Sequence, residues 1–232
     1  MNDLTIETVY CGMTNIPEEP IRSQFKNLNK ELSKCDKASI ISFAGTMNHL
    51  LFVNLVKHFA TNLKKILYYQ NLWCHKRLFM ELITLNATNN DLENSKEQIK
   101  SWDLTLCDTK IPNLEQLKKD IEETKPHYIF IDNLNDFSVG NLSENELLIE
   151  LLDLIYRNNA ILFINLGNTE FVDKIKISRG IRLVSNVIFY LKWDEDDIFL
   201  LVTLKSLNLQ YGEFSLKYDY KHFKFNEIVD SN

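Results

Sequence analysis

The stretch His127-Tyr128-Ile129-Phe130-Ile131-Asp132 decides the fold class of this chain. Its apolar run follows Pro126, ends at a carboxylate and is too short for a helix, so it predicts a strand that is buried on both faces. Runs of the same kind occupy residues 38–44, 65–69 and 160–165, which are ASIISFA, KILYY and AILFIN. Helical patterns separate these runs. The sequence therefore predicts an α/β fold with a mostly parallel, twisted sheet and helices on both faces.

The segments between these runs have the periodicity of helices or the polarity of loops. Helices are expected at residues 21–33, 48–63, 75–85, 114–123 and 144–157, residues 86–101 are polar and loop-like, and residues 104–107 form a short strand. The C-terminal part differs, because residues 186–192, 198–204 and 213–218 are strand-like runs joined by turns at residues 194–197 and near Gly212. This pattern predicts an antiparallel extension of the sheet.

The composition is that of one globular domain. The chain has 232 residues, 45% of them hydrophobic, and only 6 glycines and 4 prolines, which excludes disorder, collagen-like repeats and flexible linkers as its main content. Pro17 and Pro20 fall within residues 1–20, which we expect to form an irregular N-terminal arm. Residues 21–232 are then a single domain.

The charge balance is acidic, with 26 basic and 32 acidic side chains and a formal net charge of −6. Such a balance does not favour tight, sequence-independent binding to nucleic acid. One basic cluster leaves two interpretations open, a solvated loop or a contact to single-stranded nucleic acid. The cluster consists of Lys174, Lys176, Arg179 and Arg182.

Cysteine spacing and hydropathy indicate a cytoplasmic protein. The four cysteines lie far apart without a CxxC pair and no secretory leader pattern opens the chain, so we expect reduced thiols. The apolar runs end long before the roughly 18 residues of a membrane span, so no membrane partner is expected. No metal site is expected either, because Cys74 and His75 have no further ligand at suitable spacing, and Asp194 to Asp197 lack the alternating ligands of a calcium loop.

The turn after the first strand is where a phosphate-binding loop lies in folds of this kind. That turn is Phe43-Ala44-Gly45-Thr46-Met47-Asn48-His49-Leu50, and no glycine in the chain is followed by lysine, so G-K-[ST] is absent. Asp132, at the end of its strand, has two interpretations. It is either an aspartate that holds a magnesium-bound water or a solvated residue that caps a buried strand.

Several segments share an order of motifs with one family. Phe25 to Lys30 is similar to an F-x-x-L-D-x segment before the first strand, and Lys125 to Leu134 (KPHYIFIDNL) is similar to KPDLIVIDYLQ. The C-terminal part follows the order of motifs in the same family. A strand at residues 186–192 is followed by a strand with a terminal lysine at 199–205, then by segments similar to TG-x-x-x-L-x-F-D at 211–219 and to x-R-F at 223–225. From Ile21 to Phe225 the chain thus resembles the RecA-like motor domain of DnaB-type replicative DNA helicases. The resemblance implies a RecA-like fold.

The resemblance fails in the phosphate loop. When Met47 is aligned with the residue before G-K-T, Asn48 replaces the glycine, His49 the phosphate lysine and Leu50 the magnesium-binding hydroxyl. His49 is either a substitute cation or a residue with a structural hydrogen bond at the start of a helix, and its ordinary pKa near 6.5 favours the second. If ATP and magnesium bind at all, their contacts would be Thr46, Asn48, His49 and Asp132.

The other catalytic positions of the family are also altered. Leu72 falls at the catalytic glutamate and Leu207 at the arginine finger, whereas Lys205 keeps the position of an inter-subunit lysine. The polar sensor after the strand at residues 160–164 is Asn165 or Leu166, depending on a one-residue shift. Because phosphoryl transfer relies on such charges, the sequence predicts no catalytic residues and no resident cofactor.

Three functions are consistent with these features. The first is a catalytically inactive relative of the helicase motor domain that binds a partner with a RecA-like interface, such as a replicative helicase or its loader, in DNA replication or repair. The second is an ATPase subunit that binds nucleotide through Asp132 and Lys205 and hydrolyses it only with an intact partner. The third is a recombination-mediator paralogue that binds single-stranded DNA without nucleotide. Self-association into a homo-oligomer is open in each case.

Overall fold

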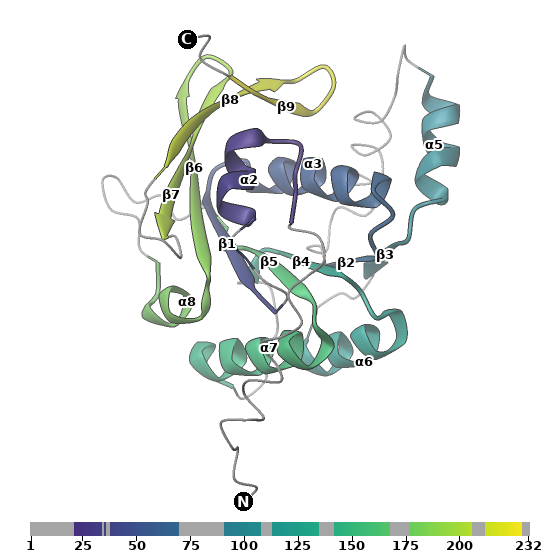
Figure 1. Cartoon of the computed structure of the whole chain (residues 1–232), viewed down its shortest axis with the longest axis vertical. Helices are drawn as coiled ribbons and strands as arrows, with labels where there is room; N and C mark the ends of the chain where they lie inside the picture. Colours follow the sequence, from purple (N-terminus) through teal and green to yellow (C-terminus); the bar gives the residue numbers. More distant parts are fainter. Residues whose placement is uncertain are drawn as a thin grey trace, which may run out of the picture.

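The computed structural model describes residues 21–33, 35, 38–69, 91–107, 113–134, 142–167, 177–205 and 212–228. The expected arm at residues 1–20 and the expected helix at residues 75–85 lie outside these described residues. One mixed sheet of nine strands runs through the described part, with helices against both of its faces (Figure 1). The α/β fold class that the sequence predicts is confirmed.

The sheet reverses its strand order at its first strand. Its order is β3-β2-β4-β5-β1-β6-β7-β8-β9, with parallel pairing from β3 to β6 and antiparallel pairing from β6 to β9. β1 therefore lies between β5 and β6, at the point where open α/β sheets bind their ligands. The strands are β1 (Ile40–Gly45), β2 (Ile66–Tyr69), β3 (Leu104–Cys107), β4 (Tyr128–Asp132), β5 (Ile161–Asn165), β6 (Val187–Glu195), β7 (Ile198–Lys205), β8 (Glu213–Asp219) and β9 (Lys224–Glu227).

The helices form a layer on each face of the sheet. α2 (Lys26–Leu32), α3 (Asn48–Thr61) and α5 (Leu92–Lys100) share one hydrophobic core with the sheet. α6 (Leu114–Thr124), α7 (Glu144–Asn158) and α8 (Arg179–Val184) share the other. Figure 1 shows α3 above the sheet, α6 and α7 below it, and the β8–β9 hairpin next to α2 and α3.

Alternation along β1 divides its side chains between the two cores. Ile41 and Phe43 belong to the core shared with α2 and α3, whereas Ile40 and Ala44 belong to the core shared with α6 and α7. Successive side chains of a strand point to opposite faces of the sheet, so a strand in which every residue is apolar must be covered on both sides. The burial of all six residues of β1 agrees with this requirement.

One expectation about secondary structure is wrong. Residues 86–101 were expected to form a loop, but α5 occupies Leu92–Lys100. Asp91 stabilises the start of this helix by accepting a hydrogen bond from the backbone N–H of Asn94, and Ser95 and Ile99 face the core. The pattern of apolar residues did not indicate a helix, because this short segment contributes a single buried hydrophobic side chain. None of the helices in the described ranges combines the length and apolarity needed to cross a membrane.

Candidate functional site

The ends of three parallel strands meet the start of α3 at the reversal of strand order. Gly45, Asp132 and Asn165 are the last residues of β1, β4 and β5, and Asp132 pairs with Asn165 in the strand register. His49 lies in the first turn of α3, which begins at Asn48 and faces the same edge. The structure thus brings together the predicted positions Asn48, His49 and Asp132.

Asp132 is the centre of a buried hydrogen-bond network. His49 Nδ1 lies 2.5 Å from Asp132 Oδ2, and the Tyr68 hydroxyl donates to the same oxygen at 3.2 Å. Asn165 Nδ2 donates to Asp132 Oδ1 at 2.8 Å. Because Asp132 is only 8% exposed, the interpretation as a solvated strand cap is wrong. Both of its carboxylate oxygens are engaged by side chains of the protein.

Asn165, rather than Leu166, faces the aspartate. Its side-chain oxygen accepts hydrogen bonds from Asn48 Nδ2 at 3.3 Å and from the backbone N–H of Gly167 at 2.9 Å, while its nitrogen donates to Asp132. Leu166 packs into the core under α6 and α7. The residue at the sensor position therefore holds Asp132 and Asn48 in place through its own side chain.

The turn between β1 and α3 is short compared with a phosphate-binding loop. β1 continues to Gly45 and α3 begins at Asn48, so Thr46 and Met47 form the whole connection. The motif G-x-x-x-x-G-K-[ST] needs a longer loop between its glycines. Counted back from Asn48, its first glycine falls on Phe43, which is a fully buried strand residue. Phe43, Ala44 and Gly45 all pair with β6.

Gly45 makes the close approach between β1 and β6 feasible. Its φ of +105° is a backbone conformation that residues with a side chain rarely adopt. A Cβ at this position would lie 2.0 Å from the carbonyl oxygen of Leu191. The same carbonyl accepts a hydrogen bond from Thr46 N at 3.0 Å. The turn is therefore fixed against β6 by backbone contacts.

Asn48 and Leu50 do not suit a magnesium triphosphate at the motif positions that the resemblance gives them. Thr46 Oγ1 and Asn48 Oδ1 are buried and have no hydrogen-bond partner among the described residues. An amide oxygen accepts but cannot donate, so Asn48 Oδ1 would repel a phosphate oxygen where the motif has a glycine. Leu50 packs against the hydrophobic core and offers no hydroxyl to a metal.

Lys205, at the predicted inter-subunit position, is bonded within its own chain. Its ammonium group donates to the carbonyl oxygen of Arg182 at 2.6 Å and to that of Ser185. These carbonyls belong to the C-terminal end of α8, where a cation is favourable. Burial lowers the pKa of Lys205 below its ordinary value. The side chain joins β7 to α8.

The remaining predicted residues are divided between the surface and the undescribed segments. Arg179 and Arg182 lie exposed on α8. Among the described residues, no group of three or more His, Cys, Asp or Glu side chains is arranged to hold a metal ion. Leu72, Cys74, His75, Lys174, Lys176 and Leu207 lie outside the described residues.

Tyr68 is the member of this network that sequence reasoning missed. It lies on β2, opposite Phe130 of β4, and its hydroxyl reaches forward to Asp132. The run KILYY predicted a buried strand, which placed a tyrosine near a carboxyl end. The pattern contained no signal that β2 is the neighbour of β4, and without that strand order the contact could not be predicted.

Comparisons with known proteins identify the fold. No protein-family model and no curated protein matches the chain. A solved structure described as an ATPase domain aligns with 98% of this chain and 100% of its own length, at 13% identity and a TM-score of 0.80. A DnaB-like replicative helicase, described with its interactions with primase, aligns with 97% of this chain at 13% identity and a TM-score of 0.77, and the match spans 66% of that helicase. The RecA-like fold predicted from the sequence is confirmed.

Proposed function

We propose that this protein is a catalytically inactive RecA-fold protein that binds and regulates a partner in DNA replication or repair. The contact between His49 and Asp132 carries the proposal. It joins the side chain at the phosphate-lysine position to the carboxylate at the magnesium position. In a working site of this type both groups face the phosphates and the metal ion instead.

The energetics of the network support the loss of nucleotide binding. A magnesium ion at Asp132 would have to displace the bonds from His49, Tyr68 and Asn165, and a hydrogen bond to a charged group contributes about 1.5–3 kcal/mol. A phosphate loop would also have to unpair the end of β1 from β6. The turn has no lysine, and Leu50 replaces the metal-binding hydroxyl of the motif, so neither position offsets these costs.

A row of exposed apolar side chains supports a protein-binding role. Ile149, Leu152 and Tyr156 are exposed on α7, and their spacing of three and four residues places them along one side of the helix. Leu183 is exposed on α8, which packs against α7. Large apolar side chains gathered on a surface are typical of protein interfaces. We name Ile149, Leu152 and Tyr156 the α7 stripe.

The fold suggests the class of partner. A protein that keeps the RecA-like framework without its nucleotide site can still dock on another RecA-like domain, so the proposed partner is a DnaB-type helicase or the loader of one. The DnaB-like helicase with the similar fold is described with its interactions with primase, which supports protein contacts as a role for this framework.

Light scattering coupled to size-exclusion chromatography tests this function with the purified chain and a purified DnaB-type helicase from the same cell. We expect a complex without nucleotide and no ATP hydrolysis by the chain alone. Ile149→Glu and Tyr156→Glu, both in the α7 stripe, should each weaken the complex by about tenfold, because a charge is then buried at the interface. Leu92→Glu, at an exposed leucine on the other helical layer, is the matched control. Turnover by the chain alone, or the absence of any complex, would contradict the proposal.

A further inference from the structure

A cleft of about 450 Å³ lies between the segment before α2, the middle of α3 and β9. Its polar lining comes from Gln24, Asn54, Lys57, Lys224, Asn226 and Glu227, and two phenylalanines complete the wall. The volume is within the range of small-ligand sites. Lys57 follows His49 by eight residues on α3, which at 1.5 Å per residue places it about 12 Å further along the helix. The cleft is therefore separate from the turn that resembles a phosphate loop.

The floor of the cleft is held rigidly by Asn54. This fully buried side chain donates to the carbonyl oxygens of Leu50 at 2.8 Å and Phe223 at 3.0 Å. Its oxygen accepts from Gln24 Nε2 at 3.2 Å and from the backbone N–H of Phe225 at 3.1 Å. Both donors and both acceptor sites of the amide are thus used, and α3 is fixed to β9 and to the segment before α2.

Two lysines face this cleft from different elements. Lys57 is half-buried on α3 and Lys224 is the first residue of β9. Burial, followed by the charge of Lys224, lowers the pKa of Lys57 below its ordinary value. Two cations that repel each other at the edge of a cleft are stabilised by an anion placed between them.

The carboxylate in the lining has another role. Glu227 accepts hydrogen bonds from the backbone N–H groups of Lys26 at 2.6 Å and Asn27 at 2.8 Å, through one oxygen each. These are N–H groups of the first turn of α2, where a negative charge is favourable. Glu227 therefore fixes α2 to β9 through both of its carboxylate oxygens.

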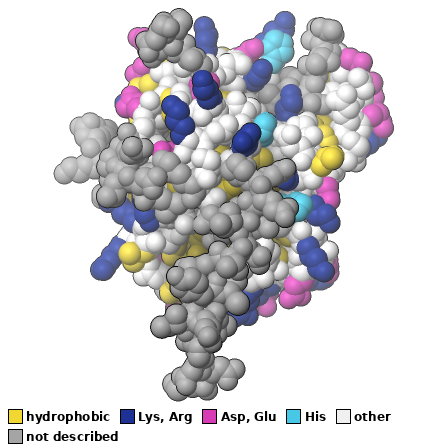
Figure 2. All heavy atoms as spheres, in the orientation of Figure 1, with side chains coloured by type: hydrophobic (Ala, Val, Ile, Leu, Met, Phe, Trp, Pro, Cys, Tyr) yellow, Lys and Arg dark blue, Asp and Glu magenta, His cyan; other side chains and the backbone are white. Residues whose placement is uncertain are grey.

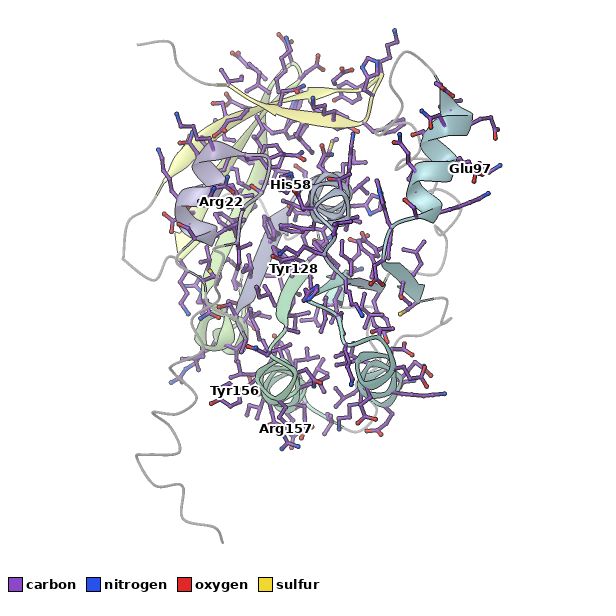
Figure 3. The ribbon with its side chains drawn as sticks, turned by 45° about the vertical axis from the view of Figure 1, so that its right-hand side comes forward. Arg22, His58, Glu97, Tyr128, Tyr156 and Arg157 are labelled. Atoms are coloured by element: carbon purple, nitrogen blue, oxygen red, sulfur yellow. The ribbon has the colours of Figure 1, made fainter. Side chains whose placement is uncertain are left out.

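The surface around the cleft is basic although the chain is acidic overall. Figure 2 shows Lys and Arg side chains in dark blue gathered over α2, α3 and β9. Three cations here are exposed: Arg22 before α2, Lys26 on α2 and Lys221 in the turn before β9. Figure 3 shows Arg22 close to His58 on the neighbouring α3. Burial lowers the pKa of His58 and so favours the uncharged form of this ring.

We infer that this cleft binds phosphate groups through Lys57 and Lys224, with the side-chain amides of Gln24 and Asn226 as further donors. An ammonium group is a compact charge that suits a phosphate, and amide nitrogens donate to its remaining oxygens. The phosphate belongs either to the backbone of a single-stranded nucleic acid or to a small phosphorylated ligand. This inference is independent of the proposed partner protein.

A binding experiment on the intact chain distinguishes the two sources. Fluorescence anisotropy of a labelled oligodeoxythymidylate, measured over a series of salt concentrations, reports the nucleic-acid backbone, and calorimetric titration with inorganic phosphate reports the small ligand. The double variant Lys57→Glu and Lys224→Glu should lose at least about tenfold in affinity for the ligand that binds. For the oligonucleotide, the slope of log affinity against log salt should fall by about 0.7, since a phosphate held between the two lysines is one contact and each contact on a single strand contributes about 0.7.

Two further variants keep the result interpretable. Lys119→Glu reverses one lysine charge on α6, in the other helical layer, and should leave binding unchanged. Lys57→Gln with Lys224→Gln removes the charges without reversing them and guards against a folding defect in the first double variant. Oligonucleotide binding that depends on the two lysines identifies the backbone as the ligand, and lysine-dependent binding of phosphate alone identifies a small ligand. Binding of neither probe, or equal binding by all variants, overturns the inference.

Discussion

His49 Nδ1 lies 2.5 Å from Asp132 Oδ2, and the side chains are 25% and 8% exposed. The contact joins α3 to the end of β4 across the edge where parallel sheets bind ligands. In the function proposed above, these two positions correspond to those that hold a phosphate and a metal ion in a working motor domain. Here the two side chains satisfy one another, which is why we regard the site as a structural element of the fold.

Replacement of His49 by alanine should destabilise the protein. Asp132 would lose a buried hydrogen-bond partner, so we expect a loss of about 1.5–3 kcal/mol in the free energy of unfolding, measured by urea denaturation. His222→Ala is a matched control, because His222 Nδ1 lies 2.6 Å from Asp219 Oδ2 in an exposed pair. Exposed pairs contribute about 1 kcal/mol or less. Equal losses in both variants would show that the buried contact contributes no more to the free energy of unfolding than an exposed pair does.

Gly45→Ala should disrupt the end of β1. The new Cβ would overlap with the carbonyl oxygen of Leu191, and alanine would be strained at a φ of +105°. We expect a loss of more than about 3 kcal/mol, or failure to fold, by thermal unfolding followed with circular dichroism. Gly212→Ala is the control, because the nearest atom to its added Cβ would be 3.7 Å away. A Gly45→Ala protein as stable as the control would mean that the turn is not fixed against β6.

Cys107 should be unreactive in the folded protein. Burial raises the pKa of its thiol to about 12, and alkylation requires the thiolate. At pH 8 we therefore expect iodoacetamide to label Cys107 slowly in native protein and rapidly in urea, as measured by peptide mass spectrometry. The rate should rise with pH well above 8. Rapid labelling of the native protein at pH 8 would contradict the burial of Cys107 at the end of β3.

Restoring the motif residues should not restore the site. The triple variant Asn48→Gly, His49→Lys and Leu50→Thr re-creates G-K-T, but β1 still pairs with β6 as far as Gly45 and leaves no loop for a phosphate. We expect no calorimetric signal with Mg-ATP. The variant should also be less stable than the parent, because Asp132 loses the contact with His49 and Asn165 loses the hydrogen bond from Asn48. Binding of Mg-ATP by the triple variant would show that the side chains of the turn, and not its length, prevent nucleotide binding in the parent chain.

The sequence predicted the central strands because a strand that is buried on both faces is a continuous apolar run. The apolar runs of β1, β4 and β5 and the alternating strands of the antiparallel extension are local signals, and the resemblance added the RecA-like fold. α5 was missed because it is short and exposes most of its residues. The sequence singled out His49 and Asp132, but it did not predict their contact. That contact joins residues 83 positions apart and depends on strand order. The same is true of Tyr68, and of Lys57 and Lys224, which come together only when β9 packs against α3.

The central claim is that the turn between β1 and α3 no longer accepts a nucleotide, and titration of the purified chain with Mg-ATP tests it most directly. Calorimetry and thermal unfolding should show no heat of binding and no rise in melting temperature at any ATP concentration. A ligand present at 100 times its Kd adds about 2.7 kcal/mol to the free energy of unfolding, which such a measurement detects readily. A saturable rise in melting temperature that Asp132→Asn abolishes would contradict the account.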